Sequence, residues 1–289
     1  MNNKEGKNKF ELALTIALKL PGVKVNRASF LKKELRNYVS KEKINQAIKS
    51  NTIEAEIDLH VLDKVAKKII SKRTTQTART SFFAGLLGGF AMAATIPADT
   101  LQFFRVALKI AQELAYLYGF EDLWIDDNAD SEKVRKELIL FLGAMFGVGG
   151  ANATLRLIST NIAKQELKKL PRQVLIRNIY LPVIKKIAET IGLKMTKDTF
   201  TKGGTKAIPL LGGVISGGLT YISMKSMGNR LRLALESSVD KNYTREDLKN
   251  DIQDLERVTG ETIDIQYEAV ESESNDVIEE ASIEKEEGF

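Results

Sequence analysis

The chain has 289 residues, with 43 lysines and arginines, 38 aspartates and glutamates, a formal net charge of +5 and no cysteine. The lack of cysteine excludes disulfides and thiolate zinc sites, and a single histidine, His60, excludes a metal site built from several imidazoles. The length suffices for one large or two small domains with a hydrophobic core. We expect a cytosolic protein without a signal peptide, because no small-residue cleavage site follows the short apolar run near residue 15.

The charge is distributed unevenly along the chain. Residues 241–289 contain 16 acidic and 5 basic residues, a net charge of −11, which leaves +16 for residues 1–240. A body this basic attracts anionic surfaces, whether lipid headgroups, nucleic acid or its own tail. We therefore predict three regions: a basic N-terminal helical region (1–50), a helical core (51–240) and an acidic, largely disordered tail (241–289).

Three short helices are predicted near the N-terminus. The first, Phe10 to Leu20, ends at Pro21-Gly22, since proline cannot continue the helix. The second begins near Ser29, and the third is capped by Ser40. Eight basic and two acidic residues lie between positions 24 and 49, which indicates either a basic docking surface or, more commonly, a solvated helix face.

A longer amphipathic helix is predicted from Ile53 to Ile70. Lys64, Lys67 and Lys68 lie opposite its apolar side. His60 falls within this segment, and a lone histidine in such a helix is seldom a ligand or base. We assign it no function.

Three segments without charged side chains follow: Thr80–Ala98, Leu138–Leu155 and Ala207–Met224. Each has 18 or 19 residues, the lower limit for spanning a bilayer, and each contains glycines three or four residues apart. Glycine disfavours a helix by about 1 kcal/mol, so we expect a compensating close approach between helices. Their content of Gly, Ala, Thr and Ser favours buried central helices of a bundle, with reversible membrane insertion as the alternative.

A carboxylate, Asp99, stands at the proline break before the predicted helix Thr100–Tyr118. Near the first turn it can stabilise free backbone N–H groups, which is a sufficient structural role. A cation-binding or catalytic role is the alternative, although no second carboxylate or histidine lies nearby in the sequence. Arg105 and Glu113 lie on the polar face of the helix, and Gly119 is predicted to cap its C-terminus.

Catalytic and nucleotide-binding motifs are missing. The sequence contains no GxxxxGK[ST], GxSxG, HExxH or EF-hand pattern, and its basic runs lack the signatures of specific nucleic-acid readers. We expect no cofactor and no metal. Residues 164–206 contain eleven basic and three acidic residues among amphipathic pieces, which is typical of a helix on an anionic membrane or of the wet face of a bundle.

The order of several motifs is similar to that of a known family. A glycine-rich helix, then Pro97-Ala98-Asp99, then a helix ending in Leu117-Tyr118-Gly119, and much later Ile208-Pro209 with Gly212-Gly213, resembles the EcsC family of bacterial proteins. The resemblance covers roughly residues 64–235. It implies an all-helical cytoplasmic protein, linked in some bacteria to a transporter-associated operon, with no established activity and no catalytic residues. The matching positions are Asp99, Tyr118, Gly119, Pro209 and Gly213.

We therefore predict an all-α bundle of eight to ten helices around glycine-rich central ones. The favoured function is non-enzymatic: peripheral association with anionic membrane, or with a membrane complex of the transporter type, through basic amphipathic helices. A second hypothesis is an enzyme or small-ligand protein with an apolar pocket beside Asp99, lined by Arg105 and Glu113. A third is nonspecific nucleic-acid binding by the basic body.

Overall fold

A computed structural model of the chain describes residues 3–79, 98–124, 132–159, 181–197 and 217–260. These residues form ten helices and contain no strand, which confirms the predicted all-α fold for this part of the chain. The helices are α1 (Asn3–Leu18), α2 (Arg27–Leu35), α3 (Lys41–Lys49), α4 (Leu59–Arg79), α5 (Ala98–Leu117), α6 (Glu132–Phe146), α7 (Ala151–Ser159), α10 (Leu181–Lys197), α11 (Gly217–Ser238) and α12 (Arg245–Thr259).

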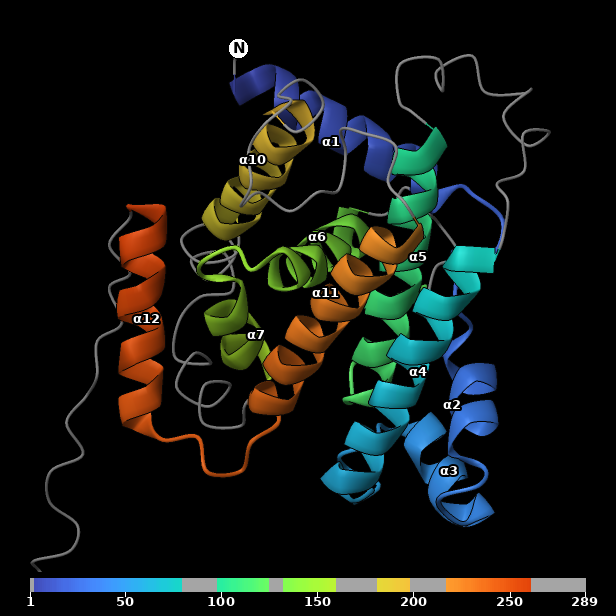
Figure 1. Ribbon diagram of the computed structural model, residues 1–289. Coiled ribbons are helices and arrows are strands. Elements are labelled where there is room, and N and C mark those ends of the chain that lie inside the picture. The colour runs from blue at the N-terminus through green and yellow to red at the C-terminus, as the bar shows by residue number, and fades with distance from the viewer. Residues whose placement is uncertain (1–2, 80–97, 125–131, 160–180, 198–216, 261–289) are drawn as a thin grey trace, which may run out of the picture.

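Helix α11 lies in the middle of the bundle and contacts α4, α5, α6 and α7 (Figure 1). Helix α1 packs against α5 and α10, and α12 packs against α7 and α10. The α2–α3 pair and α12 lie at opposite edges of the molecule (Figure 1). The α2–α3 pair and α12 therefore contribute to different surfaces of the molecule.

Helix α5 is largely enclosed by the other helices of the described core. Every side chain from residue 110 to residue 118 is buried, including the polar Gln112 and Glu113. A helix surrounded by others loses its solvated face, so its polar side chains must find partners inside the protein. The hydrogen-bond partners of these side chains therefore show whether the polar face of α5 is structural or forms a binding site.

Two predicted helix caps are confirmed. The Ser40 side chain accepts a hydrogen bond from the backbone N–H of Lys43 at the start of α3. Gly119 has φ +92°, and the N–H of Phe120 donates to the carbonyl of Ala115 at 3.0 Å, which closes the C-terminus of α5 as a Schellman motif. The helix predicted from residue 53 begins later, at residue 59, after a turn.

The glycine-rich segment at 138–155 differs from the prediction of a single helix. Gly147 and Gly150 have φ values of +66° and +81°, and they form a turn between α6 and α7. Gly143, inside α6, does allow close approach, since a Cβ there would lie 2.5 Å from Cδ1 of Ile187 on α10. The other two predicted glycine-rich segments lie mostly outside the described residues.

The first part of the predicted acidic tail (241–289) contains a helix that packs against the core. Residues 245–259 form α12, which buries Leu248, Ile252 and Leu255. Thr244 and Asp247 form a capping box at its start. The acidic composition obscured an apolar spacing of three and four residues, and residues 261–289 lie outside the described part of the chain.

Candidate functional site

The predicted site residues fall in different places. Asp99 is the second residue of α5, in its first turn, and its side chain lies outside the described part of the structure. Pro209 and Gly213 lie outside the described residues altogether. Only Arg105, Glu113, Tyr118 and Gly119 can be placed with their contacts.

Arg105 and Glu113 do not converge on one cavity. Arg105 donates from Nε to the carbonyl oxygen of Pro21 at 3.2 Å, in a solvent-exposed contact. Glu113 is 2% exposed and accepts two hydrogen bonds from Arg73 of α4, one of them from Nε at 2.7 Å. Eight residues along a helix correspond to about 12 Å. The predicted pocket beside Asp99, lined by both side chains, is therefore not formed by them.

The polar face of α5 instead holds the connection between α1 and α2. Lys109 donates to the carbonyl of Gly22 at 3.0 Å, and Gln112 donates to the carbonyl of Val23 at 3.0 Å. The Gln112 side-chain oxygen accepts from the N–H of Val25 at 3.1 Å and from the indole of Trp124 at 2.7 Å. A buried amide with every contact made rigidifies this region.

Arg27 is a basic residue whose role the sequence did not indicate. It is 6% exposed and donates to four backbone carbonyls, those of Ala47, Ile48, Ser50 and Phe120, at 2.8–3.2 Å. Three of these acceptors lie at the C-terminal end of α3, where carbonyl groups lack helical partners. Arg27 is therefore structural and does not belong to a docking surface.

The buried Tyr118 lies beside a partly buried charged cluster between α4, α5 and α11. Arg232 donates to Glu236 at 2.9 Å and to Asp63, which also contacts Lys67 at 2.7 Å. Burial raises the pKa of the Tyr118 hydroxyl, and the negative charges of Glu236 and Asp63 raise it further. The hydroxyl has no hydrogen-bond partner within the described residues, and the same holds for Nε of Arg232. Tyr118 is thus a neutral core residue.

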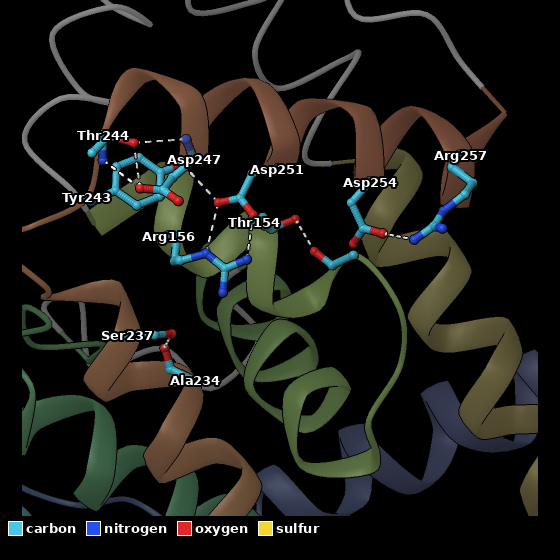
Figure 2. Close-up of polar contacts among 11 residues, drawn as sticks. Thr154, Arg156, Ala234, Ser237, Tyr243, Thr244, Asp247, Asp251, Asp254 and Arg257 are labelled. Carbon is cyan, nitrogen blue, oxygen red and sulfur yellow. Dashed lines mark hydrogen bonds and ion pairs between the residues drawn. The ribbon is translucent and has the colours of Figure 1, made fainter.

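A second buried arginine–carboxylate pair fastens α12 to α7 (Figure 2). Arg156 of α7 donates from Nε to Asp251 at 2.8 Å and makes a further bond from Nη2 to the other carboxylate oxygen. The Tyr243 hydroxyl donates to the same carboxylate at 2.8 Å. No sequence motif predicts this contact, because its members come from distant segments. The contact explains why the acidic segment 245–259 is part of the folded structure.

Exposed basic side chains lie along α2, α3 and α4. Between positions 24 and 49, seven of the eight basic side chains are exposed, compared with one of the two acidic ones. The turn after α2 lies beside α4, because the ring of Tyr38 in this turn contacts Lys64 and Lys68 of α4. We define this α2–α4 basic face by Lys32, Lys33, Arg36, Lys64 and Lys68.

Comparisons with known proteins do not identify the chain. No family model, no curated protein and no solved structure matches it. The resemblance to the EcsC family therefore stays a prediction. None of the helices in the described ranges combines the length and the hydrophobicity that crossing a membrane requires.

Proposed function

We propose that this protein is a non-enzymatic, EcsC-type cytoplasmic protein that binds peripherally to anionic membrane through its α2–α4 basic face. The observation that carries the proposal is the imbalance of exposed charge on this face. In the described part of the chain, no carboxylate pairs with its five basic side chains. Unpaired surface cations attract anionic partners instead of stabilising the fold.

The carboxylates of α2 and α4 are already neutralised by other residues. Glu34 of α2 is buried and contacts Lys72 at 3.2 Å. Asp63 of α4 contacts Lys67 and Arg232. Neither side chain offsets the charge of the basic face.

An aromatic ring holds part of this face in place. The Nζ atoms of Lys64 and Lys68 lie 5.7 and 5.6 Å from the ring centroid of Tyr38, which follows α2. Two cation–π contacts to one half-buried ring link the lysines of α4 to the end of α2. The positive charges therefore form one surface built from two helices.

The expected affinity is modest. A lysine or arginine near an anionic membrane contributes about 1 kcal/mol, so five contribute about 5 kcal/mol. This corresponds to a dissociation constant of roughly 0.2 mM and hence to reversible binding. Such binding weakens as added salt screens the charges.

Vesicle sedimentation tests the proposal. We expect the full-length protein to sediment with vesicles that contain phosphatidylglycerol, to stay in solution with pure phosphatidylcholine, and to be released by salt. Replacing Lys64 and Lys68 by glutamine should lower the bound fraction several-fold. The matched control replaces Lys185 and Lys186, two exposed lysines on α10, and should have a smaller effect.

Two results would contradict the proposal. One is binding that is indifferent to lipid charge, and the other is an equal loss in the α4 and α10 variants. A mobility-shift assay with duplex DNA at low salt separates the nucleic-acid hypothesis, which requires a shift in the absence of lipid. No specific contact in the described structure favours that hypothesis.

A further inference from the structure

Arg105 and Lys109 of α5 are held in place by backbone carbonyl groups. Their spacing of four residues puts them on one helix face, where they donate to the carbonyl oxygens of Pro21 and Gly22. Both contacts are solvent-exposed. A lysine has three donors and an arginine five, so one bond to each leaves most of their N–H groups for another acceptor.

The turn at Gly22 is shaped to admit this arrangement. Gly22 has φ +75°, a conformation that favours glycine, and a Cβ there would lie 3.3 Å from Nη2 of Arg105. A side chain at this position would therefore press on the guanidinium group. The turn between α1 and α2 thus positions Arg105 in addition to joining the two helices.

Positive charge exceeds negative charge around these side chains. Lys33 of α2 and Arg73 of α4 act on Lys109 together with Arg105, and Glu113 is the carboxylate that faces them. Glu113 is already bound by Arg73. Partial burial lowers the pKa of Lys109, and the positive charges of Arg73, Arg105 and Lys33 lower it further, against the opposing effect of Glu113.

Lys33, Arg73, Arg105 and Lys109 repel one another, and the one carboxylate among them, Glu113, is already bound to Arg73. The folded protein nevertheless holds these four cations near one another. Nearby, Glu34 is paired with Lys72 and adds no net charge. Clusters of like charge that perturb a partly buried group occur frequently at binding sites. The net charge of +3 on Lys33, Arg73, Arg105, Lys109 and Glu113 favours the binding of an anion.

The geometry points to a phosphate-binding site formed by Lys33, Arg105 and Lys109, supported from behind by the Arg73–Glu113 pair. Its ligand class is a phosphomonoester group, whose charge of about −2 and three terminal oxygens match a guanidinium fork beside two ammonium groups. The inference deepens the proposed function, on which it rests, because Lys33 also belongs to the α2–α4 basic face. The phosphate group can come from a lipid headgroup or from a soluble phosphate ester.

Titration with inorganic phosphate tests the site without any membrane. Calorimetry at constant ionic strength, with chloride as the reference anion, should show phosphate binding to the full chain. Lys109→Gln and Arg105→Gln should each weaken it at least tenfold, while Lys109→Arg, which keeps the charge, should retain most of it. Lys185→Gln, at an exposed lysine of α10 outside the proposed site and the α2–α4 basic face, is the matched control and should leave phosphate affinity within about twofold.

Two results would overturn the site. One is no heat of binding beyond that of chloride, and the other is equal weakening by Lys109→Gln and Lys185→Gln. Circular dichroism checks that each variant folds, and Arg105→Gln gives an independent measurement if Lys109→Gln does not fold. Vesicle sedimentation tests the proposed function separately. Vesicle binding can fail while phosphate binding persists, and phosphate binding can fail while vesicle binding persists.

Vesicles of equal surface charge distinguish the two phosphate sources. Phosphatidic acid exposes a phosphomonoester, whereas phosphatidylglycerol contains only a phosphodiester. Stronger binding to phosphatidic acid that Lys109→Gln abolishes supports the site with a lipid headgroup as its ligand. Phosphate binding without this preference supports the site with a soluble phosphate ester as its ligand.

Discussion

Among the arginine–carboxylate pairs that join helices in the described part of the chain, Arg156–Asp251 and Arg73–Glu113 have different surroundings. Arg156–Asp251 joins α7 to α12, and the Tyr243 hydroxyl completes the set of donors to the carboxylate (Figure 2). Arg73–Glu113 joins α4 to α5 but lies among further cations, of which Lys109 is the nearest on α5. The charges of the first pair neutralise each other, whereas the second pair is surrounded by additional positive charge. The same contact can therefore serve stability alone or support a binding site.

The largest expected effect is on the second pair. Glu113→Ala removes the carboxylate that holds Arg73, and the remaining cations repel one another without compensation. We expect a loss of about 4 kcal/mol in the free energy of unfolding, measured by urea denaturation. The double variant Arg73→Met/Glu113→Leu should recover most of the loss, because it removes both charges. A loss below about 1 kcal/mol for Glu113→Ala would refute this account.

Asp251→Ala should have a smaller effect. The Arg156 side chain is 26% exposed, so it can reach water once the carboxylate is gone. We expect a loss of about 2 kcal/mol, partly from the unpaired Tyr243 hydroxyl. Hydrogen exchange should accelerate in α12 and remain unchanged in α4, since the damage is local. Uniform acceleration would show that α12 does not unfold separately.

The sequence predicted the elements of this comparison better than their contacts. The periodicity of α5 placed Arg105 and Glu113 on its polar face, and Gly119 marked its end, because both signals are local. The partner of Glu113 comes from α4, forty residues earlier. Nothing local to either residue specifies such a pairing, so a pocket beside Asp99 was an equally consistent hypothesis.

Charge composition was the less reliable guide. It assigned residues 245–259 to a tail, although Leu248, Ile252 and Leu255 lie on one buried face of α12. It also counted Arg27 among the basic residues of a docking surface or a solvated helix face, although the structure buries it against carbonyl groups. Net charge reports solubility and steering, whereas apolar spacing and burial decide which charged residues belong to the fold.

The cluster at Tyr118 is an intermediate case. The charges of Arg232 and Asp63 are paired, but the neighbouring Tyr118 hydroxyl has no hydrogen-bond partner in the described chain. Tyr118→Phe removes a hydroxyl without a hydrogen-bond partner in the described chain, so its desolvation penalty disappears. We expect a gain of about 1 kcal/mol in the free energy of unfolding. Thermal denaturation measures it. An equal loss would show that the hydroxyl interacts favourably with Arg232, either directly or through a bound water.

The smallest expected effect is that of Lys109→Met, and its sign is opposite to that of a substitution in the Arg156–Asp251 pair. Lys109→Met should stabilise the protein at pH 7 by less than about 1 kcal/mol, since it removes one of four cations and only a solvent-exposed bond to Gly22. Arg156→Met should instead destabilise it, because Asp251 then stays buried without its partner. Opposite signs for the two substitutions would show that only the α4–α5 pair carries surplus charge.

The pH dependence of Lys109→Met separates this electrostatic account from a simple packing gain. The pKa of Lys109 is lower in the folded protein than in the unfolded chain, so the unfolded state binds more protons between these two values. Stability of the wild type should therefore rise as the pH increases toward about 10. The advantage of Lys109→Met in urea denaturation should shrink over the same range, whereas an advantage independent of pH would assign the gain to packing.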